Sequence, residues 1–351
     1  MRKIGALFAI VLALGTGCAT SFHSQQGSPY AQKTAPGTVL QSLTLDPVLE
    51  DRILALDPER ITADDVRNTL APGPTPRVVA LHGGIYPVHL AMESFAEFLV
   101  GMGYPEDKLR HPGDGRLSHS PYENSEHIAG LVAWYYEKEG TRPMLVGHSQ
   151  GGIQAVKVLY EFAGAFTDRI PVWNPLTDQA EDRFTIIDPV TGLERPVVGI
   201  RLGYVSVVGA GGVALLLPNQ WRMAGRLRTV PDTVDEFTGY WIGVDLFAWD
   251  FGFAAVSAYR GEKGVKIRNV RLPAYYSHVV APVTAYIAKD ARLREWIDAY
   301  HPGMLNGFAT LPEGPNDNLL WAADVWYEVK KHWCLEAQRL IRAKRAALGA
   351  K

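Results

Sequence analysis

Apolar residues recur along this chain at two spacings, and the alternation between these spacings predicts the fold. Short apolar runs suited to buried strands lie at 77–81, 144–146 and 203–208, and residues 266–272 are predicted to form a further strand. Apolar positions at helical spacing lie at 92–102, 128–135, 153–163 and 321–349. Helices that alternate with strands in this way connect parallel strands, so we expect the α/β class with a mostly parallel, doubly wound sheet and helices on both faces.

Three segments interrupt this alternation. Apolar stretches at 183–187 and 197–200 flank a turn at 188–192, which predicts a hairpin-like insertion, or small cap, over about 165–200. The unusually apolar residues 213–217 suit a pocket lining, a lid or ordinary core packing. The polar stretch 231–236 has the acidic residues of a helix start.

The amino terminus carries the pattern of an export signal. Arg2 and Lys3 precede an apolar run at 4–14 that is too short to span a membrane. Gly17-Cys18 after this run resembles the lipobox of bacterial lipoproteins, although Gly15 stands where a leucine is usual. The resemblance implies a signal peptide over 1–17, lipidation of Cys18 and an anchor in the cell envelope, at the outer membrane. Cleavage after Ala19 by the ordinary signal peptidase is the alternative.

Composition changes this picture in only a few ways. The chain has 351 residues, 47% of them hydrophobic, which is enough for a sizeable core. We expect a tether and amino-terminal extension over 18–76, ending in a proline-rich connector, and a main domain over 77–351. The net charge of −2 without a basic face argues against nucleic acid as a partner. Cys18 and Cys334 are the two cysteines, and without zinc-like ligand spacing we expect neither a metal nor a cofactor.

The candidate chemistry lies between the predicted strand 144–146 and the helix after it. Gly147-His148-Ser149-Gln150-Gly151 has the G-x-S-x-G pattern of a nucleophile elbow, a sharp strand-to-helix turn that holds the serine hydroxyl clear of both elements. A glycine-rich turn of this kind can also bind a phosphate or simply make a bend. The strand before it and the helix after it favour the catalytic interpretation.

With Gly-His-Ser-Gln-Gly-Gly at 147–152, the chain resembles the α/β-hydrolase superfamily, in particular its bacterial lipases and esterases. The resemblance extends from about Arg77 to His301. It implies that His82-Gly83-Gly84, after the first central strand, shapes an oxyanion hole. We assign one N–H donor to Gly84 or Ile85 and the second to Gln150. An ordinary turn is the alternative, and His82 is expected to be structural.

A catalytic serine needs a histidine to accept its proton and an acid to orient that histidine, in the chain order serine, acid, histidine. His278, His301 and His332 come after Ser149, and we favour His278 because it ends a predicted strand. The acids between serine and histidine are Asp232, Asp235, Asp245 and Asp250. Asp250 is slightly favoured and Asp245 is the alternative, because each ends an apolar run.

The resemblance therefore implies a serine hydrolase that cleaves carboxylic esters through an acyl-enzyme on Ser149, with an ester or lipid substrate and membrane attachment through the amino terminus. An envelope phospholipase or acyltransferase is an alternative from the same fold. A catalytically silent, membrane-anchored binding protein is the non-enzymatic alternative.

Overall fold

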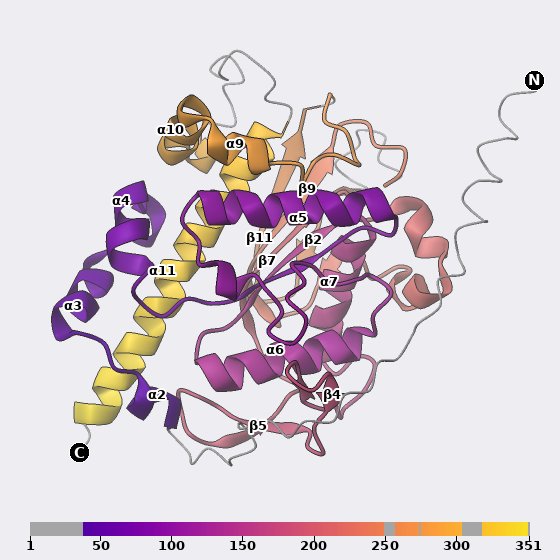
Figure 1. Ribbon diagram of the computed structural model, residues 1–351. Coiled ribbons are helices and arrows are strands. Elements are labelled where there is room, and N and C mark those ends of the chain that lie inside the picture. Colours follow the sequence, from indigo (N-terminus) through magenta and orange to yellow (C-terminus); the bar gives the residue numbers. More distant parts are fainter. Residues whose placement is uncertain (1–37, 249–256, 274, 304–317, 350–351) are drawn as a thin grey trace, which may run out of the picture. The chain divides into compact units, whose positions relative to one another are not determined.

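A five-stranded sheet forms the centre of the computed structural model, which describes residues 38–248, 257–273, 275–303 and 318–349 (Figure 1). Its order is β1-β2-β7-β9-β11, and every neighbouring pair is parallel. The strands are β1 (Val78–Leu81), β2 (Met144–His148), β7 (Leu202–Val208), β9 (Val234–Ile242) and β11 (Lys266–Leu272). The predicted α/β class is confirmed, and the arrangement is consistent with an α/β-hydrolase fold.

Helices cover both faces of this sheet. They are α5 (Tyr86–Gly101), α6 (Ser125–Glu139), α7 (Gln150–Phe162), α9 (Ala285–Lys289), α10 (Ala291–Ala299) and α11 (Leu319–Gly349). Alternate strand residues point to opposite faces: Val78 and Ala80 belong to a core with α5 and α11, whereas Val79 and Leu81 belong to a core with α6 and α7. Since both faces are covered, β1, β2 and β7 are buried throughout, and their mainly apolar runs revealed them in the sequence. The edge strand β11 has exposed residues and several polar side chains. Among the described residues, no helix is long and apolar enough to cross a membrane.

The described part of the amino-terminal extension packs against the carboxyl-terminal helix, as Figure 1 shows. Its short helical elements are α2 (Thr38–Ser42), α3 (Pro47–Ala55), η1 (Pro58–Arg60), α4 (Ala63–Asp65) and η2 (Val66–Leu70). Ile53 is buried against Ala337 and Ile341 of α11. Glu50 accepts hydrogen bonds from Lys344 at 2.6 Å and Arg345 at 2.9 Å, so the basic end of α11 is paired with this extension.

The remaining elements are short. Two antiparallel pairs come after α7, β3 (Trp173–Asn174) with β4 (Gln179–Ala180) and β5 (Thr185–Ile187) with β6 (Glu194–Pro196). The predicted hairpin therefore exists, but its second strand lies before 197–200. The others are η3 (Glu106–Lys108), η4 (Gly212–Leu216), η5 (Pro218–Met223), β8 (Thr229–Val230) and β10 (Arg260–Gly261).

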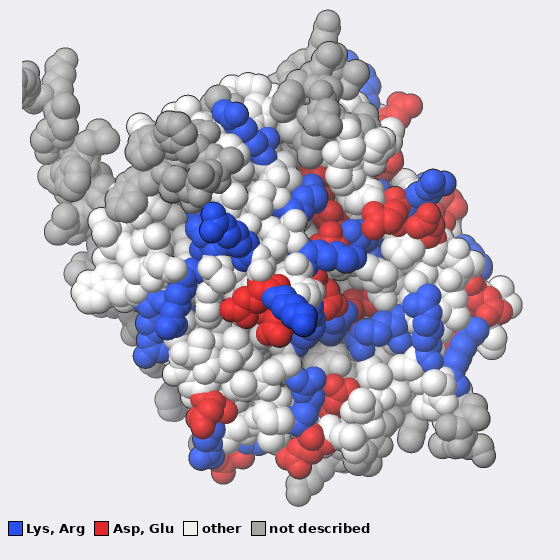
Figure 2. Space-filling model, turned by 180° about the vertical axis from the view of Figure 1, so that it is seen from behind, with Lys and Arg blue, Asp and Glu red and all other residues white. Residues whose placement is uncertain are grey.

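The helix start expected at 231–236 is wrong, because Val234 begins the nine-residue strand β9. The acidic residues there pair across the sheet edge instead of capping a helix. Asp235 accepts from Arg142 at 2.8 Å, and Glu236 pairs with Lys331 at 2.9 Å. Figure 2 shows basic and acidic side chains interspersed over much of the face opposite to the view of Figure 1.

Candidate functional site

Ser149 occupies the turn between β2 and α7 in a strained backbone conformation. Its φ of 56° and ψ of −123° are unusual for a residue with a side chain, and such strain is concentrated at functional sites. The Ser149 N–H donates to the carbonyl of Val208 at 2.8 Å, which fixes the turn to β7. The strand β2, this sharp turn and the helix α7 lie at the residues where the sequence predicts them.

The glycines of the motif are required by close approach to the backbone. A Cβ on Gly147 would lie 2.6 Å from the carbonyl oxygen of Gly151. A Cβ on Gly151 would lie 2.2 Å from the carbonyl oxygen of Leu81, at the end of β1. Any side chain at these positions would push the elbow away from β1 and α7 away from β2, so the motif serves the geometry of Ser149.

His278 and Asp245 complete a hydrogen-bonded line from the serine. His278 Nε2 lies 2.8 Å from Ser149 Oγ, and His278 Nδ1 lies 2.6 Å from Asp245 Oδ2. The network assigns Nδ1–H as the donor to the carboxylate and leaves Nε2 to accept the serine proton. The other carboxylate oxygen, Oδ1, accepts from the N–H groups of Phe247 at 3.0 Å and Ala248 at 3.1 Å. Asp245 is buried, with only 1% of its side chain exposed.

The other candidates from the sequence lie elsewhere. Asp250, the slightly favoured acid, is outside the described residues, and Asp245 is the carboxylate in contact with His278. Asp235 is paired with Arg142 at the opposite edge of the sheet. His332 is buried in α11 and stacks on Tyr204, with ring centroids 4.7 Å apart. His301 is exposed after α10.

A second histidine supports His278, and sequence reasoning gave it no role. His148 Nε2–H donates to the backbone carbonyl of His278 at 2.6 Å. Burial lowers the pKa of His148 to about 3, with a further contribution from His278, so the ring is neutral and can keep this donor. Its Nδ1 has no hydrogen-bond partner in the described part of the chain. His148 occupies the variable position directly before the serine in the G-x-S-x-G motif. A polar ring at this position was the signal in the sequence that could have identified it.

Gly209 was also missed, although it comes directly after the strand β7 that neighbours the elbow strand. Its φ is +63°, and a Cβ there would lie 2.9 Å from His278 Nδ1. The imidazole of His278 therefore packs directly against the backbone of Gly209, where no side chain would fit. On another side, the ring of Phe247 lies 5.3 Å from that of His278, centroid to centroid.

The candidate oxyanion loop comes after β1 and lies against the elbow. A Cβ on Gly83 would be 3.1 Å from Ser149 Cβ, and one on Gly84 would be 2.1 Å from the side-chain oxygen of Gln150. His82 Nδ1–H donates to the Gly83 carbonyl at 2.7 Å, and burial lowers the pKa of His82, which suits a structural histidine. The loop thus lies against Ser149 and the side chain of Gln150, and the assignment of N–H donors to Gly84 or Ile85 and to Gln150 stays a prediction.

Two other polar clusters are filled by their own partners. Glu236, Glu328 and His332 have ligand atoms within 4.8 Å of one another, but Lys331 Nζ lies 2.9 Å from Glu236 and 3.5 Å from Glu328. The ammonium group therefore stands where a metal cation would bind.

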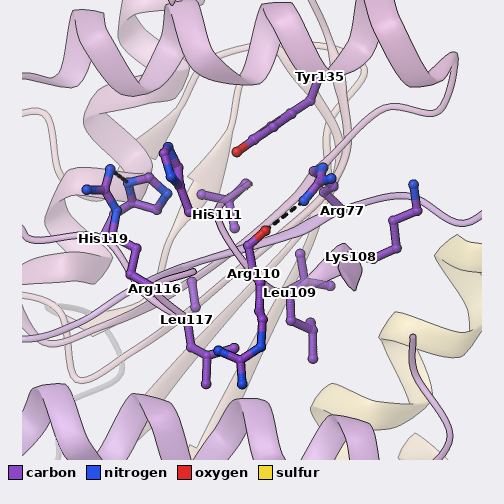
Figure 3. A pocket seen from close by; sticks show the side chains of 12 residues that line it. Arg77, Lys108, Leu109, Arg110, His111, Arg116, Leu117, His119 and Tyr135 are labelled. Atoms are coloured by element: carbon purple, nitrogen blue, oxygen red, sulfur yellow. Dashed lines mark hydrogen bonds between the residues drawn. The ribbon is translucent and has the colours of Figure 1, made fainter. Parts of the chain in front are cut away.

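The pocket in Figure 3, beside β1, has a volume of about 10 Å³, room for about one water molecule. Its cationic residues are also paired: Arg77 contacts Glu139 at 2.6 Å, and Arg116 contacts Asp114 at 2.9 Å. A site for a larger ligand does not fit here.

No family model matches this chain, and no curated protein matches it. Among solved structures, it resembles one described as "RedJ with PEG molecule bound in the active site", at 14% sequence identity and a TM-score of 0.30. The match covers 66% of this chain and 92% of that chain. A TM-score this low gives no information about the site, whose chemistry is set by the distances between Ser149, His278 and Asp245.

Proposed function

We propose that this protein is a serine hydrolase that cleaves carboxylic esters, with Ser149 as nucleophile, His278 as base and Asp245 as the acid. The observation that carries the proposal is the line of hydrogen bonds from Asp245 through His278 to a serine held at positive φ. A serine hydroxyl is a weak nucleophile unless a base accepts its proton, and this line supplies both the base and the group that orients it.

The reaction would proceed in two halves. Ser149 Oγ attacks the ester carbonyl carbon while His278 Nε2 takes the hydroxyl proton, and the N–H groups of Gln150 and of Gly84 or Ile85 stabilise the oxyanion. Collapse of this intermediate breaks the bond to the alcohol, which leaves with the proton from His278. Water, deprotonated by His278, then attacks the acyl carbon. The bond from this carbon to Ser149 Oγ breaks, Oγ takes the proton back from His278, and the carboxylic acid is released.

Hydrolysis of p-nitrophenyl esters from short to long acyl chains tests the proposal. The Ser149→Ala variant should lose about 10³-fold or more in kcat while its thermal unfolding is unchanged. A fluorophosphonate should label the wild type at Ser149 and leave the variant unlabelled. Equal rates for the two proteins across the series would remove ester hydrolysis and leave a binding role. Release of a lysolipid, or transfer of the acyl group to an added alcohol, would identify the phospholipase or acyltransferase alternative.

We also propose that the chain is exported and anchored through a lipid at Cys18, which lies outside the described residues. The support is the charged, apolar and small-residue order of residues 2–19. In fractionated bacteria, Cys18→Ser should move the protein from the membrane to the soluble fraction. Retention of this variant in the membrane would contradict the anchor.

A further inference from the structure

Four segments that meet around Ser149 are almost free of charge. Residues 78–92, 202–221, 237–248 and 272–288 contain a single Asp, Glu, Lys or Arg among them, which is Asp245. Charged residues make up 21% of the whole chain, so this depletion is far from the average. Each segment includes the carboxyl end of a strand and the residues directly after it, and in a parallel sheet these ends lie at one edge.

The same segments expose large apolar side chains to solvent. In the described part of the chain, seventeen large apolar side chains are exposed, and eleven of them belong to these four segments. A twelfth, Tyr122, donates a hydrogen bond to the Gly84 carbonyl at 3.0 Å. We call these twelve residues the apolar rim: Ile85, Tyr86, Leu90, Tyr122, Val213, Leu216, Trp221, Val244, Leu246, Phe247, Tyr275 and Val280.

Contacts between the loops join parts of the apolar rim to one another and to His278. The N–H of Val213 donates to the carbonyl of Phe247 at 3.3 Å, which joins the η4 turn to the loop that carries Asp245. Asn219 Nδ2 donates to the carbonyl of Pro121 at 3.1 Å, which joins η5 to the loop of Tyr122. Phe247 in turn packs against His278. Exposed apolar patches of this kind mark surfaces that bind a partner.

We propose that the apolar rim docks on the uncharged acyl surface of assembled lipid, so that the substrates of Ser149 are esters within a lipid layer or aggregate. This inference rests on the proposed function and specifies its substrate class. A partner that covers the rim also covers Ser149, so a protein bound there would block the site, whereas a lipid surface delivers the ester to it. Within the four segments, Asp245 is the only charged residue and it is buried, so these segments add little to the cost of desolvation against hydrocarbon. Arg222 beside Trp221 and Glu123 beside Tyr122 border the rim.

Two matched pairs of variants test the docking in the chain without the predicted signal peptide, residues 1–17. All proteins carry Cys18→Ser, so neither an apolar leader nor an acyl anchor can contribute, and Ser149→Ala, so the vesicles stay intact. Leu216→Glu in the rim, where the leucine is 62% exposed, is compared with Leu348→Glu near the end of α11, where it is 59% exposed. Leu246→Glu is compared with Leu193→Glu in the β5–β6 turn, both at leucines that are 69% exposed.

Co-flotation with vesicles of pure phosphatidylcholine is the measurement. Each rim variant should lower the partition coefficient about tenfold or more, because one large side chain no longer enters hydrocarbon, while its control binds as the parent does. Equal binding by the two members of both pairs would overturn the proposal. So would binding that requires anionic phosphatidylglycerol and is reversed by salt, or a dimer of the parent that the rim variants convert to monomers.

A separate assay keeps the docking distinct from the chemistry. With Ser149 restored, Leu216→Glu and Leu348→Glu should both hydrolyse dissolved p-nitrophenyl acetate at the parental rate, and Leu216→Glu alone should be slow on an emulsified long-chain ester. An inactive parent that still floats with vesicles would refute the esterase and retain the docking. An active parent whose rim and control variants act equally on the emulsion would refute the docking and retain the esterase.

Discussion

The two ends of the central strands differ sharply in charge. At the amino ends, Arg77, Arg142 and Arg201 come just before β1, β2 and β7. Arg142 contacts both Asp235, at 2.8 Å, and Glu336 of α11, at 2.6 Å. At the carboxyl ends, Asp245 is the single charged residue of the four loop segments, and its partner is an imidazole.

The charged residues at the two edges therefore have different roles, in stability at the amino edge and at the candidate site at the carboxyl edge. At the amino edge, ion pairs tie strands, α6 and α11 together, so a substitution there acts on folding. At the carboxyl edge, the one carboxylate bonds to His278 without competing ions among these segments, so under the proposed function a substitution there should act on catalysis. Substitutions at both edges test that division of roles, in decreasing order of expected effect.

The strongest effect is expected from Asp245→Asn. The amide cannot stabilise the imidazolium and favours the wrong tautomer of His278, so kcat for a soluble ester should fall about 10⁴-fold. The denaturant midpoint should change little, because the backbone N–H groups of Phe247 and Ala248 can still bond to the amide oxygen. Asp250→Asn is the matched control and should keep its activity; the reverse result would assign the acid role to Asp250.

At the amino edge, Arg142→Met should act on stability alone. It removes one of two cations from Glu336, which is 1% exposed, while Arg339 stays 2.9 Å away. The cost should therefore lie below the cost of about 3–5 kcal/mol for a fully broken buried pair, at about 2–3 kcal/mol. Urea unfolding measures the loss, while kcat/KM of the folded variant should match the wild type. Arg60→Met, which removes an exposed pair with Asp57, should cost less than about 1 kcal/mol. If Arg142→Met lost activity without losing stability, the amino edge would also act on catalysis, and the proposed division of roles between the two edges would be wrong.

His148 offers a finer test at the carboxyl edge. His148→Phe removes the donor to the His278 carbonyl, and the resulting displacement of the base should lower kcat about 10- to 100-fold with KM nearly unchanged. His148→Gln restores an N–H donor near the position of Nε2 and should recover most of the rate. If the two variants are equally impaired, the ring matters for packing and not for this hydrogen bond.

The smallest effect concerns stability against pH, through Glu328 of α11. Burial raises the pKa of this carboxyl from 4.5 to about 7, although Arg268 opposes the shift. The folded protein therefore holds the proton more tightly than the unfolded chain. The stability linked to this group is complete below pH 4.5 and is lost as the pH rises to about 7.

Glu328→Gln removes this titration. The variant should be more stable than the wild type at pH 8 by about 1–3 kcal/mol, with no matching gain at pH 4.5. Thermal or urea unfolding at the two pH values, compared between the proteins, isolates this group. A variant that is less stable at pH 8 would mean that the ion pair with Arg268, at 3.0 Å, outweighs burial.

Sequence patterns predicted the three apolar strands β1, β2 and β7 and also the more polar β11, but they failed at the polar start of β9. β1, β2, β7 and β11 lie within a few residues of their expected positions. β9 was missed at its start because Asp235 and Glu236 have the pattern of a helix amino terminus. Their partners Arg142 and Lys331 are remote in sequence, and only the folded chain brings them together.

The same limit applies to the site. The elbow is a local motif, so Ser149 and its glycines could be identified from adjacent residues. The choice between Asp245 and Asp250 depended on where β9 ends, and no local pattern marked Ile242 as its last residue. His148 and Gly209 contact His278 across the sheet edge. These residues are far from His278 in the sequence, so their spacing could not predict the contacts.

The packing of Gly151 against the end of β1 has a consequence for how the protein folds. Because Gly151 meets the carbonyl oxygens of Leu81 and His82, the elbow closes around Ser149 only after β1 has paired with β2 in the register Leu81 to Gly147. A slip of one residue would turn Leu81 to the other face of the sheet. During refolding, esterase activity should therefore appear no earlier than this pairing, and its recovery gives a kinetic probe of the first two strands of the sheet.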